Sequence, residues 1–247
     1  MTYCVGIEVD EGLVFAADTR TNAALDNVRV HRKLHAFEYP GEAVFVLMAA
    51  GNLATTQLLV SRLHRDVEEQ REPNLRTIRH LFEAVEYVGA LLVSSQVQCR
   101  DPEQGHDGVN TEATLILGGQ IAGDPPGVYM IYPLGNAIAA SPETPYLQIG
   151  ESKYGKPILD RIIRPRTALD DAARTAVVSL DSTMRSNLSV GLPLDLVLIR
   201  RGELCIRDQL RLDGDSPLYS DIHQNWARRL EQAVSALPRF PWEAGTV

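Results

Sequence analysis

Cysteine is scarce in this sequence, and long apolar runs are missing. The three cysteines, Cys4, Cys99 and Cys205, are scattered and show no CxxC spacing, which argues against a zinc ribbon or a disulfide framework. They predict reduced core thiols in a cytoplasmic protein. No apolar run reaches the length of a membrane span, and the N-terminus lacks the basic region of a secretory signal. We therefore expect a cytoplasmic protein without a membrane partner.

Basic residues are few relative to acidic ones. The 24 Lys and Arg residues are outnumbered by 32 Asp and Glu residues, so the net charge is −8, and no block of basic residues exceeds a pair. This composition argues against a nucleic-acid surface. The chain also lacks an internal linker rich in Gly, Ser or Pro. We therefore predict a single domain spanning residues 1–247, with a C-terminal tail from about residue 238.

The apolar patterns predict strands and helices that arrive in blocks. Short apolar runs bounded by turn residues predict strands at 3–9, 13–17, 42–50, 113–117, 128–132, 136–140, 194–200 and 204–210. Apolar stripes at helical spacing predict helices at 53–70, 75–98, 152–163, 167–184 and 221–237. A polar loop is predicted at 101–108. Because strands and helices do not alternate strictly, the order favours an α+β fold over a doubly wound parallel sheet.

The second residue carries the most informative chemistry. A small residue after the initiator Met favours removal of Met1, and Thr2 would then carry both a hydroxyl and a free α-amine. Such a residue can serve as nucleophile and base together. The α-amine suits the second role because its reference pKa, about 7.7–8.0, is close to working pH. The alternative is an ordinary processed N-terminus, since many proteins begin with Met-Thr.

Asp18 and Lys33 are the candidates for supporting Thr2. Asp18 ends the second apolar run, and Lys33 follows one polar stretch later. An ammonium near the α-amine would lower the pKa of that amine by like-charge repulsion, and a buried lysine needs a counter-charge that Asp18 can supply. Arg32 is the other nearby cation, although its bulk fits the role less well. Taken alone, the residues are explained equally well by a structural ion pair.

Gly51 ends a predicted strand and precedes a predicted helix. Its backbone N–H is therefore a candidate donor to a developing oxyanion, because the N-terminus of a helix favours negative charge. An ordinary glycine between a strand and a helix gives the same sequence signal.

The N-terminal half resembles the proteasome β-type subunits. The resemblance rests on Thr2-x-x-Val5-Gly6-Ile7, on the stretches from Gly12 to Arg20 and from Ala50 to Gln57, and on Lys33. The opening Met-Thr-Tyr-Cys-Val-Gly looks most like the Anbu (ancestral β-subunit) group of that family. The resemblance implies an N-terminal nucleophile hydrolase fold, which is a four-layer αββα sandwich. It also implies catalytic roles for Thr2, Asp18 and Lys33.

The same resemblance implies further site residues. Ser152 and Ser189 match supporting serines of the catalytic centre, and the main chains of Thr21 and Gly51 match positions that pair with an extended peptide. The residues near the first specificity pocket are Ala49, Leu53, His31 and His35. The family's usual carboxylate after the fourth helix is missing, because Ser186 stands at that position.

Two other kinds of site fit the sequence less well. His31 and His35 are spaced i, i+4, but their segment is predicted as strand or loop rather than helix, so we expect no metal site. The stretch from Gly150 to Lys156 fits the GxxxxGK pattern of a phosphate loop, but Pro157 follows where Ser or Thr is required. We therefore expect no cofactor and no nucleotide.

Three functions stay open from the sequence. The first is a threonine peptidase that acts on peptides or unfolded proteins inside a self-compartmentalising homo-oligomer, either a ring or an open spiral. The second is an assembly protein of the same fold with little or no peptidase activity, which Ser186 favours. The third is an N-terminal nucleophile amidase for small amides. The sequence leaves open whether an ATPase partner exists.

The predicted last helix and tail carry large apolar side chains, at Trp226, Leu230, Val234, Phe240 and Trp242. Apolar side chains near a terminus favour contacts with a second copy of the chain. The alternative is that this helix only closes its own core.

Overall fold

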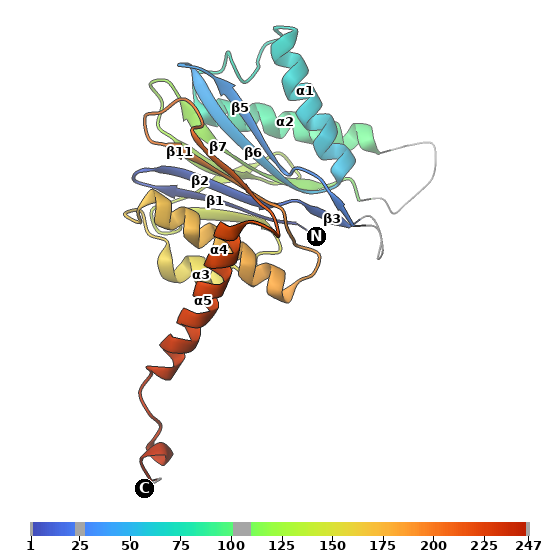
Figure 1. The fold of residues 1–247 in the computed structure, drawn as a ribbon. Helices are drawn as coiled ribbons and strands as arrows, with labels where there is room; N and C mark the ends of the chain where they lie inside the picture. Colours follow the sequence, from blue (N-terminus) through green and yellow to red (C-terminus); the bar gives the residue numbers. More distant parts are fainter. Residues whose placement is uncertain (1, 23–27, 101–109, 246–247) are drawn as a thin grey trace.

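The computed structural model describes residues 2–22, 28–100 and 110–245, which form two antiparallel sheets with covering helices (Figure 1). The first sheet has the strand order β10-β1-β2-β11-β12, and its strands are β1 (Tyr3–Val9), β2 (Gly12–Asp18), β10 (Tyr146–Gly150), β11 (Leu194–Arg200) and β12 (Asp208–Leu212). The second has the order β5-β6-β7-β8-β9, and its strands are β5 (Leu34–Tyr39), β6 (Ala43–Gly51), β7 (Ala113–Ile121), β8 (Gly127–Ile131) and β9 (Ala137–Ala139). A short ribbon pairs β3 (Arg20–Asn22) with β4 (Val28–Val30).

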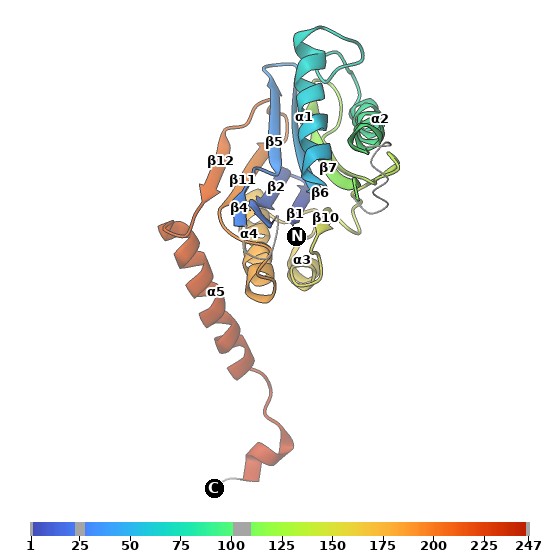
Figure 2. The ribbon, with the colours of Figure 1, turned by 90° about the vertical axis from the view of Figure 1, so that its right-hand side faces the viewer.

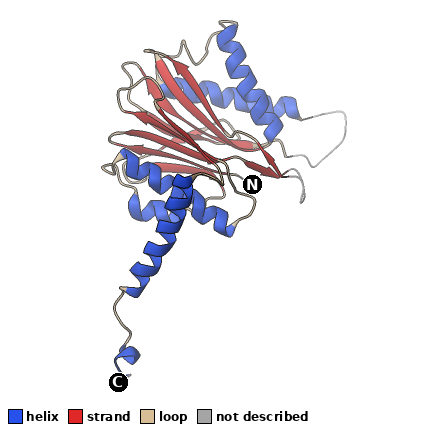
Figure 3. Cartoon of the chain, viewed as in Figure 1, coloured by secondary structure: helices blue, strands red, loops and turns tan. Residues whose placement is uncertain are grey.

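The helices cover the outer face of each sheet, so the body of the molecule has four layers (Figures 2 and 3). Helices α1 (Leu53–Glu68) and α2 (Leu81–Cys99) pack on the second sheet, and α3 (Lys156–Ile162) and α4 (Leu169–Ser186) pack on the first. The predicted α+β fold and its αββα layering are confirmed.

The first strand shows why its sequence is apolar on both faces. Tyr3, Val5 and Ile7 belong to the cluster that contains side chains of α3 and α4. Cys4, on the opposite face of the strand, belongs to the cluster between the two sheets. Successive side chains of a strand point to opposite faces, so a strand inside a four-layer sandwich buries both sets.

Glycines let the two sheets approach each other closely. A Cβ atom on Gly118 would lie 2.6 Å from Cζ of Phe15, and one on Gly6 would lie 2.9 Å from Cγ1 of Val128. The predicted strand at 113–117, followed by a turn at Gly119, is therefore too short. Strand β7 continues through Gly118 and Gly119 to Ile121, because the missing side chain at Gly118 makes room for the Phe15 ring.

Some predicted helix boundaries are wrong because side-chain hydrogen bonds decide them. The helix predicted at 75–98 begins only at Leu81. Before it, the Asn74 Oδ1 atom accepts hydrogen bonds from the backbone N–H groups of Arg76 and Thr77, at 2.9 and 3.2 Å, and holds a turn. The last helix, α5 (Pro217–Ser235), begins earlier than predicted, because the Ser216 side chain caps it.

Other expectations need smaller corrections. Helix α3 begins at Lys156 after a turn, and β12 covers 208–212 rather than 204–210. All three cysteines are free, but only Cys4 is a core residue, since Cys99 and Cys205 are partly exposed. The polar loop predicted at 101–108 lies outside the described residues.

Helix α5 leaves the sandwich and projects away from it, followed by the tail (Figures 1 and 2). None of its residues is buried. Its first half is tied to α4, because the Asp181 Oδ1 atom lies 2.7 Å from both the Tyr219 hydroxyl and Nδ1 of His223. Among the described helices, none combines the length and hydropathy needed to cross a membrane.

Candidate active site

Thr2 is held at the end of β1 from two sides. Strands β1 and β2 pair with Cys4 opposite Ala17. This register brings Tyr3, the residue between Thr2 and Cys4, to the Asp18 carboxylate. The Tyr3 N–H donates to Oδ1 of Asp18 at 2.9 Å. On the other side, the carbonyl of Thr2 accepts a hydrogen bond from the N–H of Glu151, just past β10, at 2.7 Å. The segment that carries the hydroxyl therefore belongs to the sheet.

Asp18 and Lys33 form a buried ion pair beside this segment. The Lys33 Nζ atom lies 2.7 Å from Oδ1 of Asp18, and the two side chains are 7% and 0% exposed. The same ammonium donates to the carbonyl of Arg20 at 2.6 Å. The pairing expected between these two residues is thus present, and it involves Lys33 rather than Arg32.

The Asp18 carboxylate also accepts two bonds on its other oxygen. The N–H groups of Arg20 and Gly191 donate to Oδ2 at 3.1 and 3.3 Å. Burial raises the pKa of the Asp18 carboxyl above its ordinary value, while the Lys33 ammonium and the donating N–H groups oppose that shift. A carboxylate with this many donors is fixed in position, and it fixes Lys33 in turn.

A cleft with a volume of about 380 Å³ opens beside Thr2. Of the residues expected at the substrate, Thr21, His35, Ala49 and Leu53 line it, together with Gly51 and Lys33. His31 is not among the lining residues. The cleft is also lined by Arg32, Thr56 and Gly150, for which the sequence analysis proposed no role at the substrate. These residues come together at the cleft because segments that are distant in the sequence meet there, and no local sequence pattern shows such a meeting.

Gly51 ends β6 next to the cleft, immediately before α1. Its φ angle is +125°, and an added Cβ atom would lie 2.4 Å from the carbonyl oxygen of Glu112. Both facts require glycine here. Asn52 caps the following helix by accepting from the Thr55 N–H. An oxyanion role for the N–H of Gly51 stays a prediction.

Ser152 and Ser189 lie in two turns that approach each other near Thr2. The turns are joined by a hydrogen bond of 3.0 Å from Nδ2 of Asn187 to Oε2 of Glu151. The Oδ1 atom of Asn187 accepts from the N–H of Ser189 at 2.9 Å. Among the hydrogen bonds found in the described residues, none joins either serine to Thr2. No motif in the sequence points to a role for Glu151 or Asn187.

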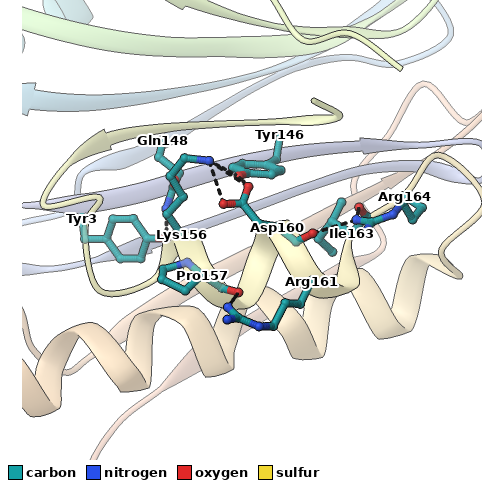
Figure 4. Close-up of polar contacts among 9 residues, drawn as sticks. All are labelled: Tyr3, Tyr146, Gln148, Lys156, Pro157, Asp160, Arg161, Ile163 and Arg164. Carbon is teal, nitrogen blue, oxygen red and sulfur yellow. Dashed lines mark hydrogen bonds and ion pairs between the residues drawn. The ribbon is translucent and has the colours of Figure 1, made fainter. Parts of the chain in front are cut away.

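The Tyr3 side chain anchors the segment from behind. Its hydroxyl lies 2.6 Å from Oγ of Ser179 on α4 and accepts from Nε2 of Gln148. Figure 4 shows Tyr3 and Gln148 beside a second cluster, in which Lys156 contacts Asp160 and the Tyr146 hydroxyl. Burial raises the pKa of Tyr3 to about 12.

The structure also shows the surroundings of the GxxxxGK stretch and of potential metal ligands. The Lys156 ammonium, the last residue of the GxxxxGK pattern, lies 2.8 Å from Oδ1 of Asp160 one turn further along α3. Over the residues that the structure describes, no three His, Cys, Asp or Glu side chains gather as metal ligands.

The proteasome subunit family model matches residues 2–198 of the chain. This chain belongs to the proteasome subunit family. Several solved structures of that family share its fold over nearly the full length. Anbu (ancestral beta-subunit) from Yersinia bercovieri is 42% identical, with a TM-score of 0.90, and the match covers 96% of this chain and 99% of that one. A search of curated proteins finds no match.

Two further Anbu structures agree with the first. The helical assembly of the Anbu complex from Pseudomonas aeruginosa contains a chain that is 41% identical, with a TM-score of 0.90, and the match covers 97% of this chain and 98% of that one. Anbu from Hyphomicrobium sp. strain MC1 is 40% identical, with a TM-score of 0.87, and the match covers 97% and 99%. The resemblance inferred from the sequence, to proteasome subunits and to Anbu, is therefore confirmed.

The structure places Ser186, where the sequence resemblance leads us to expect a carboxylate, at the end of α4. Ser186 is exposed to solvent. Glu151 lies beside Thr2, because its own N–H binds the Thr2 carbonyl. Glu151 and Asn187 therefore supply polar groups on this side of the site.

Proposed function

We propose that the protein is a threonine-type peptidase that uses Thr2 after removal of Met1. The observation that carries the proposal is the buried Asp18–Lys33 pair, which is hydrogen-bonded to the residue next to Thr2 at the edge of a cleft. A buried ion pair adds little to stability by itself. Its position beside a candidate nucleophile therefore favours a chemical role.

In the proposed reaction, the Thr2 hydroxyl oxygen attacks the carbonyl carbon of an amide. The free α-amine of Thr2 accepts the hydroxyl proton and then delivers it to the departing amine, so that an ester to Thr2 forms as the C–N bond breaks. Water then attacks the ester, with the α-amine again as base, and the products are a carboxylic acid and free Thr2.

The surrounding groups assist this reaction electrostatically. Lys33 disfavours a second positive charge on the nearby α-amine and so keeps the base available. Asp18 holds Lys33 in place. The N–H of Gly51, at the cleft and ahead of α1, stabilises the negative charge that develops on the carbonyl oxygen. Ser152 and Ser189 are proposed to support the site through the turns that Glu151 and Asn187 join.

We further propose that the chain acts as a homo-oligomer, a ring or an open spiral that limits access to Thr2. Large apolar side chains are exposed on α5 and in the tail, with Leu230 46%, Val234 67% and Trp242 72% exposed. An Anbu relative is described as a helical assembly. Peptides and unfolded proteins in the cytoplasm are the proposed substrates, because a compartment excludes folded ones.

An assembly protein with an idle Thr2 is the second candidate. It is favoured by Ser186, which lacks the negative charge expected at that position. The amine of Thr2 would then have one hydrogen-bonding partner fewer to orient it. The two candidates share the oligomer and differ only in whether Thr2 reacts.

Covalent labelling separates the two candidates. Intact-mass measurement should first find the chain without Met1. A peptide epoxyketone should then add one molecule to the wild type and to Thr2→Ser, which keeps a hydroxyl, but not to Thr2→Ala. The folded fraction of Thr2→Ala should be unchanged, because the substitution removes only a small polar group. Retained Met1, or equal labelling of Thr2→Ala, would show that the threonine mechanism is wrong.

The oligomer is tested by its mass. Light scattering at micromolar concentration should give a mass many times 27.3 kDa. Deletion of 238–247 should lower that mass if the tail contributes to the contact. A monomer at this concentration would contradict the proposed compartment and leave the Thr2 chemistry to be judged by labelling alone.

A further inference from the structure

The cleft beside Thr2 is lined by cations and by no carboxylate. Its ionisable lining side chains, among the described residues, are those of Arg32, Lys33 and His35, and the remaining lining residues are Thr, Ala, Gly and Leu. A peptide side chain that enters this cleft therefore meets positive charge and small neutral groups. Which of these three side chains acts on the peptide as a charge depends on its own partners and protonation.

Lys33 contributes little net charge to the cleft. Its ammonium lies 2.7 Å from the Asp18 carboxylate, and both groups are buried. The ion pair is neutral as a unit, so a ligand a few ångströms away experiences a dipole rather than a charge.

Arg32 is different because its charge is not matched nearby. It is exposed, and within 2–22, 28–100 and 110–245 its guanidinium takes part in no hydrogen bond or ion pair. Its charge acts on the carboxylate of Asp195, which is itself buried and lies 3.1 Å from Nη1 of Arg211. Asp195 does not line the cleft. Arg32 is thus left with donors for a ligand.

His35 adds hydrogen bonding rather than charge. Burial lowers the pKa of its imidazole, and the nearby His64 and Arg32 lower it further. At neutral pH the ring is therefore uncharged, with one donor and one acceptor nitrogen. The hydroxyl groups of Thr21 and Thr56 add polar groups to the cleft wall, and the short side chain of Ala49 leaves space in the cleft.

We propose that this cleft selects peptides with an acidic side chain, Asp or Glu, at the residue whose carbonyl Thr2 attacks. The Arg32 guanidinium binds the carboxylate, for which its planar set of donors is suited. The proposal rests on the proposed peptidase function and names its substrate class.

The test uses tripeptide epoxyketones that differ only in the last residue, which is Asp, Glu, Leu or Lys. The rate of covalent labelling is followed by intact mass. We expect Asp or Glu to label up to about fivefold faster than Leu, since an exposed charge pair is worth up to about a factor of five, and Lys to be slowest. Leu or Lys labelling as fast as both acidic peptides would overturn the selectivity and leave the Thr2 mechanism standing.

Variants assign the selectivity to one residue. Arg32→Gln should bring Asp, Glu and Leu to similar rates, and Arg32→Glu should make Lys the fastest probe. The matched control is Arg29→Gln, because Arg29 is an exposed arginine on the neighbouring ribbon that does not line the cleft. An Arg32→Gln protein that keeps the acidic preference would contradict the assignment.

A binding measurement tests the acidic preference even if no probe labels Thr2. Tripeptides that end in Asp, Leu or Lys as free acids are titrated into Thr2→Ala and followed by calorimetry. The terminal carboxylate is common to all three, so differences report the side chain. Binding of the Asp peptide no tighter than that of the Leu peptide would overturn the proposal, whatever the outcome of labelling.

Discussion

The sandwich and the C-terminal extension bury their apolar side chains in opposite ways. In the sandwich, Phe15 is 0% exposed and fills the space that Gly118 leaves between the sheets. In the extension, Phe240 and Trp242 stack on each other, with ring centroids 4.5 Å apart, and are 57% and 72% exposed. One chain thus holds two kinds of apolar surface, one buried inside the sandwich and the other exposed on the extension.

The largest expected effect compares one aromatic side chain from each region. Phe15→Ala should destabilise the fold by about 3–5 kcal/mol, because it leaves a cavity between two sheets. Trp242→Ala should change the stability of the monomeric fold by less than about 0.5 kcal/mol. Denaturant unfolding at low protein concentration measures both. Similar losses would show that the tail is part of the folded core.

A second comparison sets the buried carboxylate of the site against the one at the base of α5. Asp18→Asn should cost roughly 3 kcal/mol, because Lys33 is left buried without its counter-charge. Asp181→Asn should cost about 1 kcal/mol, since an amide oxygen still accepts from Tyr219. Thermal unfolding of both variants tests the order. If Asp18→Asn were the milder change, the Asp18–Lys33 pair would not be structurally required.

Tyr3 allows a test by pH. Its pKa is raised to about 12, against about 10 in the unfolded chain. The folded state therefore holds the proton more tightly, and this contribution is fully present below pH 10 and lost as pH rises through 12. The loss is roughly 3 kcal/mol over that window.

Tyr3→Phe should remove this part of the pH dependence. At neutral pH the variant should lose only about 1 kcal/mol, because one buried hydroxyl and its hydrogen bonds are missing. Urea unfolding of both proteins between pH 9 and 12 gives the difference. Parallel curves for the two proteins would mean that the Tyr3 hydroxyl ionises freely.

The smallest effect on stability belongs to the extension. Leu230→Ser combined with Val234→Ser should leave the free energy of unfolding of the dilute protein unchanged within about 0.5 kcal/mol, because both side chains are exposed. The same variant should lower the mass seen by light scattering. Arg228→Ser and Arg229→Ser on the same helix serve as the control. An unchanged mass would show that Leu230 and Val234 do not form the proposed contact between copies.

Much of the sandwich could be predicted from the sequence because its strands are apolar on both faces. Thr2, Asp18 and Lys33 could also be proposed as site residues, since Thr2 follows the initiator Met, Asp18 ends an apolar run and Lys33 suits a buried pair with Asp18 better than Arg32 does. What was missed depends on contacts between distant segments. Helix α2 starts late because of the Asn74 side chain, and no local pattern shows it.

The candidate site shows the same limit. Glu151 and Asn187 meet across 36 residues of sequence, and Gly191 reaches Asp18 from 173 residues away. Neither approach leaves a periodic signal. The sequence shows Arg32 only as an alternative to Lys33, because its exposure in the cleft depends on which way the chain turns before β5.

The position of α5 after all the described strands has a consequence for synthesis. A helix of 19 residues extends roughly 28 Å, and its apolar stripe would be adhesive on a nascent chain. Since translation proceeds from the N-terminus at roughly 5–20 residues per second, every strand of both sheets leaves the ribosome before this stripe does. The order of the elements thus delays exposure of the adhesive surface until the body has had time to fold.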